Sequence, residues 1–142
     1  MSEWGAVLDA VQLTLSGDKE LGEQTLRRCW SQTMPSDHAQ RCVIAHYLAD
    51  LQSDVATEVE WDERALAEFD DVSDSDLAPI GVPNAKGFAP SLHLNVGDGY
   101  LRMGRLDDAA GVLAGVLRRG FPAGPASRET VGRVGTDRKS VV

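Results

Sequence analysis

The sequence has 142 residues, of which 42% are hydrophobic and 25% are charged. This length suits one domain with a modest core, and the composition is that of a globular protein rather than a disordered chain. The formal net charge of −8 at pH 7 argues against a nucleic-acid partner, because proteins that bind a phosphate backbone gather Lys and Arg on one face.

No apolar run approaches the roughly 20 residues that a bilayer-spanning helix needs. The first residues also lack the basic start and apolar stretch of a signal peptide. We therefore expect a cytoplasmic protein without a membrane partner. The two cysteines, Cys29 and Cys42, are too few for a disulfide framework, and we expect both to be reduced and buried.

Two antiparallel helices are predicted at the N-terminus. The first covers residues 3–15, because apolar side chains recur there at spacings of three and four: Trp4, Val7, Leu8, Val11 and Leu15. Ser16, Gly17 and Asp18 form a short turn. A second apolar stripe predicts a helix over residues 19–33 that ends before Pro35, with Leu21, Leu26, Cys29 and Trp30.

The next segment repeats this hairpin. Ser36 or Asp37 is the expected N-cap of a third helix that continues to about Gln52, with Cys42, Ala45, Leu48 and Ala49 facing inward. Ser53 or Asp54 is the expected cap of a fourth helix, in which burial is predicted for Val55, Val59, Trp61, Ala65, Leu66 and Phe69. Carboxylates are frequent over residues 37–76, with only Arg41 and Arg64 to offset them. This pattern indicates a solvated acidic face or a basic partner.

Residues 70–89 predict a long irregular connection with at most one short helical turn, because Pro79, Gly81, Pro83 and Gly87 break helices. Pro90 and Ser91 then open a fifth helix that Gly104 ends. Its apolar positions are Leu92, Leu94, Val96, Tyr100 and Leu101. A sixth helix is predicted over residues 107–118 with Ala109, Val112, Leu113, Val116 and Leu117. No stretch alternates with a period of two, so the predicted fold class is all-α.

The third hairpin resembles a tetratricopeptide repeat, a family with a period of about 34 residues. Small, aromatic, turn and apolar positions of that pattern are matched by Gly97, Tyr100, Gly104, Ala109, Leu113 and Val116, with Pro122 just beyond. The first hairpin matches more loosely through Ala10, Leu13, Gly17, Gly22, Leu26 and Cys29, and the second has only Ala45 and Leu48 in register. The resemblance implies a right-handed superhelix of about three antiparallel hairpins over residues 1–120.

The same resemblance implies a non-catalytic module that binds a protein or peptide. In tetratricopeptide domains the first helix of each pair lines a concave groove, and polar side chains there hold the ligand. The matching positions are Asn95, Asp98, Arg102, His46 and Asp50. An Asn can clamp a peptide backbone, and Arg102 can hold a carboxylate through two hydrogen bonds. The alternative is that these are ordinary exposed residues.

A metal-binding sensor or enzyme is the alternative function, because His38, Cys42 and His46 recur every four residues and Cys29 could add a fourth ligand for zinc. Against this, no Cys-x-x-Cys pair occurs, and Cys29 and Cys42 occupy positions that packing requires to be small and apolar. Asp70, Asp71, Asp74 and Asp76 are poor candidates for calcium, since the twelfth position counted from Asp74 holds Ala85. His93 lies near Ser91, but two residues apart on one helix they point in different directions. We expect no enzyme activity, cofactor or metal.

Residues 121–142 are rich in Gly, Pro and Arg and are predicted to be a disordered or artefactual tail. Residues 137–142 back-translate to the start of a widely used sequencing adapter, so we expect the natural gene to continue differently. A chain that lacks its final capping helix would expose the apolar face of the sixth helix. Marginal stability or self-association through that face is the expected consequence.

Overall fold

The computed structural model describes residues 4–119. These residues form six α-helices: α1 (Trp4–Leu15), α2 (Lys19–Gln32), α3 (His38–Asp50), α4 (Val55–Phe69), α5 (Ala89–Arg102) and α6 (Leu106–Arg119). Within this range the structure contains no β-strand. The prediction of an all-α fold is therefore confirmed, and each helix lies within a few residues of its expected bounds.

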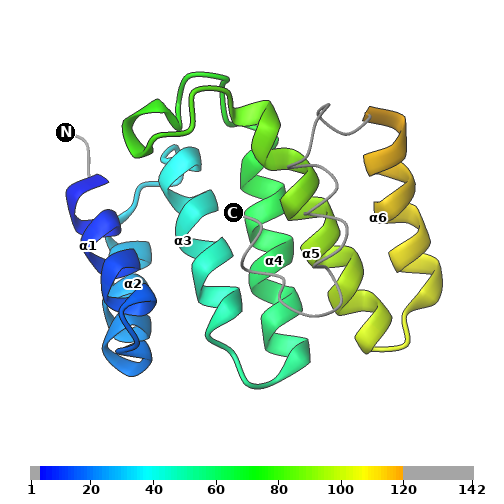
Figure 1. Cartoon of the computed structure of the whole chain (residues 1–142), viewed down its shortest axis with the longest axis horizontal. Coiled ribbons are helices and arrows are strands. Elements are labelled where there is room, and N and C mark those ends of the chain that lie inside the picture. The colour runs from blue at the N-terminus through cyan, green and yellow to red at the C-terminus, as the bar shows by residue number, and fades with distance from the viewer. Residues whose placement is uncertain (1–3, 120–142) are drawn as a thin grey trace.

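The helices form three antiparallel hairpins, α1–α2, α3–α4 and α5–α6, which lie side by side in chain order (Figure 1). Neighbouring hairpins contact each other mainly through α2 with α3 and through α4 with α5. Each hairpin thus covers part of its apolar surface by packing on the next hairpin. Figure 1 shows α1 and α6 at opposite ends of this row.

Short polar residues and glycines end the helices as the sequence predicts. The Asp54 carboxylate accepts a hydrogen bond of 3.0 Å from the backbone N–H of Thr57 and so caps α4. Gly104 turns the chain between α5 and α6 with a φ of 77°, a left-handed conformation that favours glycine. Asp37 occupies the N-cap position of α3, as one of the two predicted candidates, but its carboxylate accepts from the backbone N–H of Met34 rather than from a helix N–H.

The paired helices α5 and α6 approach closely at Gly97. A Cβ atom added at Gly97 would lie 2.8 Å from Cδ2 of Leu113, closer than real Cβ atoms come to a neighbour. Ala109 is buried in the same hairpin. Gly97 therefore permits a close approach of α5 and α6 that a larger residue would prevent.

The connection between α4 and α5 folds over one end of the helical row. It contains two short 3-10 helices, η1 (Ala78–Ile80) and η2 (Ala85–Phe88), where the sequence predicts at most one helical turn. Figure 1 shows it passing above α3 toward α1 and back to the start of α5. Leu77 and Phe88 from this connection are buried in the same apolar core as α3. The connection is thus part of the core rather than a free loop.

Several leucines that the periodicity places inside are exposed. They are Leu8, Leu15 and Leu21 in the first hairpin and Leu101 and Leu117 in the third. In α1 the buried side is formed by Trp4, Val7, Ala10 and Thr14. Among residues 4–119 the outer hairpins have a neighbouring hairpin on one side only, and these leucines are not covered by it. No helix among residues 4–119 is long and apolar enough to cross a membrane. The predicted disordered or artefactual tail, residues 121–142, lies outside the described residues.

Candidate functional site

The five predicted groove residues do not share one environment. Asp98 and Arg102 lie one turn apart on α5, where Arg102 Nε donates to the Asp98 carboxylate over 3.0 Å. The same guanidinium donates through both Nη atoms to Glu58 of α4, over 3.2 and 2.6 Å. Arg102 therefore holds a carboxylate with two hydrogen bonds, as predicted for a ligand, but that carboxylate belongs to the protein.

The other predicted groove residues differ in accessibility. Asn95 is 1% exposed and His46 is fully buried. The His46 ring contacts the rings of Phe88 and Tyr47 edge to face, with centroids 5.4 and 5.0 Å apart. Asp50, at the end of α3, is exposed. A role in ligand binding stays a prediction for all five residues.

The side chains of the alternative metal site, His38, Cys42 and His46, are not arranged as ligands of one metal ion. His38 Nδ1 lies 2.7 Å from Glu68 Oε1, whereas His46 lies among aromatic rings. The Cys42 thiol is buried, and burial raises its pKa from 9.0 to about 12, so it ionises less readily than an exposed thiol. In the described part of the chain no group of three or more His, Cys, Asp or Glu residues is placed to hold a metal.

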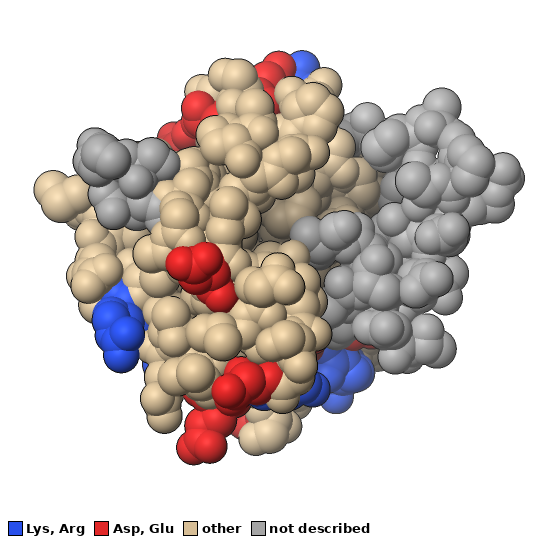
Figure 2. Space-filling model, turned by 60° about the vertical axis from the view of Figure 1, so that its left-hand side comes forward, with Lys and Arg blue, Asp and Glu red and all other residues tan. Residues whose placement is uncertain are grey.

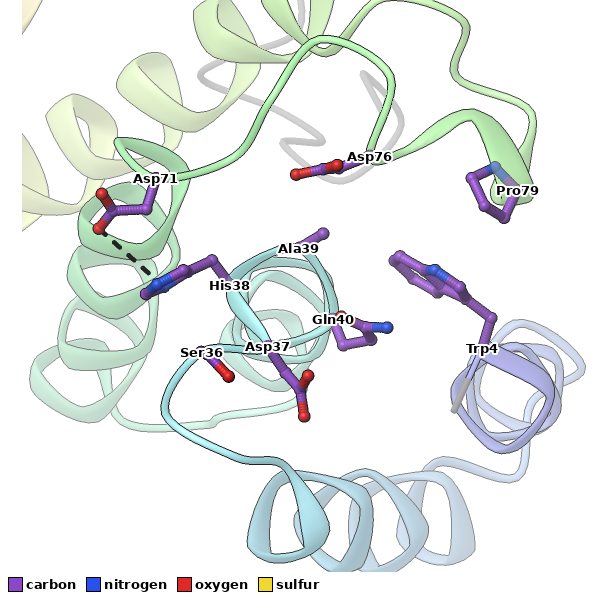
Figure 3. Close-up of a pocket in the computed structure, with 9 residues that line it drawn as sticks. All are labelled: Trp4, Ser36, Asp37, His38, Ala39, Gln40, Asp71, Asp76 and Pro79. Atoms are coloured by element: carbon purple, nitrogen blue, oxygen red, sulfur yellow. Dashed lines mark ion pairs between the residues drawn. The ribbon is translucent and has the colours of Figure 1, made fainter. Parts of the chain in front are cut away.

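A hollow of about 350 Å³ lies where the α4–α5 connection passes over the start of α3. Its walls are Trp4, Pro79, Asp71, Asp76 and the segment Ser36, Asp37, His38, Ala39 and Gln40. In Figure 3 Trp4 and Pro79 form one side of the hollow, and His38 and Asp71 lie on the other side. The distance from His38 Nδ1 to Asp71 Oδ2 is 4.0 Å. Carboxylates and an indole suit a cationic group.

Local structure already uses two of these carboxylates. The Asp37 carboxylate accepts from the backbone N–H of Met34 over 2.8 Å, and Asp76 accepts from that of Ser73 over the same distance. Both bonds stabilise the turns that border the hollow. On the face shown in Figure 2, acidic side chains lie at several separate places and form no single patch. The positions of Asp37 and Asp76 at the hollow are therefore explained by the turns that border it.

A cluster of arginine and tryptophan side chains lies on α2, α3 and α4. We name it the arginine–tryptophan surface, and it consists of Arg27, Trp30, Arg41, Trp61 and Arg64. Trp30 of α2 and Trp61 of α4 contact each other edge to face, with ring centroids 5.1 Å apart. This contact joins the first hairpin to the second.

Three guanidinium groups lie over these two indoles. Arg41 is 4.0 Å from the Trp30 centroid, and Arg64 is 4.5 Å from the Trp61 centroid and 6.0 Å from that of Trp30. Arg27 is 5.6 Å from the Trp61 centroid. Such stacking is a cation–π interaction, which contributes about 0.5–1 kcal/mol at an exposed site.

The three arginines differ in their carboxylate partners. Arg27 pairs with Glu23 over 2.9 Å, and Arg41 pairs with Glu68 over 3.0 Å. Arg64 is exposed and forms no ion pair or hydrogen bond with any residue in the range 4–119. The surface therefore has one guanidinium group whose donors are not used by the described protein.

Sequence reasoning missed this surface, although a local signal exists. Arg27 and Trp30 are three residues apart on one helix, as are Trp61 and Arg64 on another, and this spacing places both members on one helix face. The predicted burial of Trp61 is confirmed, since it is 6% exposed, and the partly buried Trp30 packs against the same core. What was not predicted is that three arginines would lie over these two indoles. Comparisons of the chain with known protein families, with curated proteins and with solved structures find no match.

Proposed function

We propose that this chain is a non-catalytic module that binds a protein segment, and that its hairpins stack in the manner of tetratricopeptide domains. The observation that carries the proposal is the arginine–tryptophan surface. Trp and Arg are among the residues that contribute most to binding energy at protein interfaces. Here two of one type and three of the other lie together on helices from two hairpins.

The surface is also preorganised. The edge-to-face contact fixes the two indoles, and the guanidinium of Arg41 is held both by the Trp30 ring and by Glu68. Side chains that are already ordered lose little conformational entropy when a partner binds. The helices therefore hold these side chains in place before a protein segment binds.

The predicted groove is the second place where a segment could bind. Its residues Asn95 and His46 are almost fully buried, and Arg102 is engaged by Glu58. The arginine–tryptophan surface instead has an exposed arginine, Arg64, whose donors are not used by any residue in the range 4–119. The available guanidinium of Arg64, rather than exposure of the indoles, of which Trp61 is only 6% exposed, favours the surface over the groove.

Selection from a displayed library of random peptides tests the proposal. We expect enriched peptides to bind the Arg64→Ala variant at least on the order of tenfold more weakly than the parent chain, the loss expected for a residue that dominates an interface. Arg28→Ala is the matched control, because Arg28 is also exposed on α2 and contacts neither indole among the described residues. Peptides should bind Arg28→Ala as tightly as they bind the parent chain.

Two results would contradict the proposal. One is a selection that enriches no peptide. The other is a set of peptides that bind Arg64→Ala and the parent equally. If such peptides instead lose affinity for Asp50→Ala, which alters the exposed groove residue, the binding site is the groove.

A further inference from the structure

We infer that the arginine–tryptophan surface recognises a short acidic protein segment, with one carboxylate of that segment held by Arg64 through two parallel hydrogen bonds. This inference rests on the proposed function and names the chemistry of its partner. It depends on the way in which Arg64 is stacked, on its neighbours and on the charge around it.

Stacking leaves the edge of the Arg64 guanidinium available. The group lies over the Trp61 ring at 4.5 Å and within reach of Trp30 at 6.0 Å. A guanidinium has five N–H donors that lie in its plane, and its contacts with the two indoles are not hydrogen bonds to a carboxylate or carbonyl oxygen. Within residues 4–119 none of these donors is bonded. A carboxylate is the group whose two oxygens match this planar fork.

The neighbouring guanidinium groups are only partly neutralised. Arg27 donates through Nε and Nη2 to a single oxygen of Glu23. Arg41 donates through Nε to Glu68 and through Nη1 to Thr33 Oγ1. Glu60, one turn before Arg64 on α4, forms no ion pair with it. The surface therefore contains one more guanidinium than the carboxylates that pair with its arginines.

A nucleic acid suits this surface less well than an acidic segment. Proteins that bind single strands stack bases on open aromatic faces along a basic groove. Here guanidinium groups lie over the indoles, and Trp61 is only 6% exposed. The net charge of −8 would also repel a long polyanion. A short segment with a few carboxylates can meet the arginines with less of this repulsion.

The test uses a fluorescein-labelled peptide of glycine and serine with glutamate at alternate positions. Matched peptides have glutamine or lysine at those positions, and a single-stranded DNA oligomer of similar length is the polyanion control. Binding to the full chain is measured by fluorescence anisotropy at neutral pH. We expect the glutamate peptide to bind more tightly than all three comparison probes.

Substitutions at Arg64 then locate the contact. R64L should weaken binding of the glutamate peptide on the order of tenfold or more, as expected for the loss of a charge-assisted pair of hydrogen bonds. R64K keeps the charge but lacks the planar fork, so a smaller loss of a few-fold is expected. R28A should bind like the parent chain. Helical content and melting temperature of each variant are compared with those of the parent, and R64K carries the test if R64L does not fold.

The inference is overturned if the glutamate peptide does not bind or if its glutamine counterpart binds equally. Tighter binding of the lysine peptide or of the DNA oligomer, or full affinity in R64K, has the same consequence. Failure here is distinct from failure of the proposed function. Displayed peptides that depend on Arg64 but contain no Asp or Glu would overturn the acidic partner and leave protein binding in place.

Discussion

The close contact of α1 with α2 at Gly22 gives a quantitative prediction about the first hairpin. A Cβ atom added at Gly22 would lie 2.3 Å from Thr14 Oγ1 and 3.1 Å from both Cα and N of Thr14. The Thr14 hydroxyl donates to the carbonyl of Ala10 over 3.1 Å and is buried. The substitution Gly22→Ala therefore forces both this side chain and the backbone of α1 to move.

The opposing contributions can be compared. Alanine in place of glycine within a helix stabilises by about 1 kcal/mol. Overpacking of a tight contact costs about 1–3 kcal/mol, and a displaced Thr14 hydroxyl loses a hydrogen bond that contributes about 1 kcal/mol. We expect Gly22→Ala to lower the free energy of unfolding by about 2 kcal/mol, the midpoint of these contributions.

Urea unfolding followed by helical ellipticity measures this change. Gly111→Ala is the matched control, because a Cβ atom added at Gly111 of α6 meets no atom within 4 Å. It should raise the free energy of unfolding by up to about 1 kcal/mol. Combining Gly22→Ala with Thr14→Ala should recover part of the loss, because the nearest clash is then removed. A Gly22→Ala variant as stable as the parent would refute the close approach.

Further predictions concern pH and self-association. Burial raises the pKa of Cys42 from 9.0 to about 12, and burial together with the hydrogen bond to Glu63 raises that of Tyr100 from 10.0 to about 12. Above a pH of about 9 the unfolded chain therefore releases protons that the folded chain retains, and stability should fall as the pH rises toward about 12. Unfolding of Cys42→Ala across this range should show a shallower loss, and an equal slope would contradict the assignment. For self-association, Leu106 and Leu117 of α6 are 63% and 73% exposed. Sedimentation should show association that increases with concentration and weakens in Leu117→Lys, whereas a monomer at all concentrations would exclude this contact.

Local patterns predicted the helices because helix ends and periodicity depend on neighbouring residues. Gly104 could be assigned from chain position alone, and Asp54 was one of two candidate caps with Ser53; the structure confirms Gly104 and selects Asp54. The buried side of α1 could not be assigned in this way, since Leu8 and Leu15 belong to an apolar stripe that overlaps the one containing Val7 and Ala10. Contacts with α2, including the close approach of Gly22 to Thr14, and with α3 and η1 determine which side packs.

The candidate site depended still more on contacts distant in sequence. Breakers in the α4–α5 connection predicted irregular structure, but not that Phe88 would return to contact His46 of α3. A histidine assigned to an open groove is therefore a core residue. Arg102 likewise finds Glu58, which is 44 residues away in the chain. In both cases a residue from another part of the chain makes the contact that was predicted for a bound ligand.

The contact between Trp30 and Trp61 links the proposed binding surface to the packing of the first two hairpins. Each indole belongs to a different hairpin, and Arg64 of the second hairpin stacks near both. A segment that binds Arg64 would therefore contact a joint between hairpins rather than a single helix. Since the joint exists only in the folded chain, a bound segment should raise the free energy of unfolding by mass action. It should do so in the Arg28→Ala variant but not in Arg64→Leu, so ligand-dependent stability provides a measure of recognition that is independent of anisotropy.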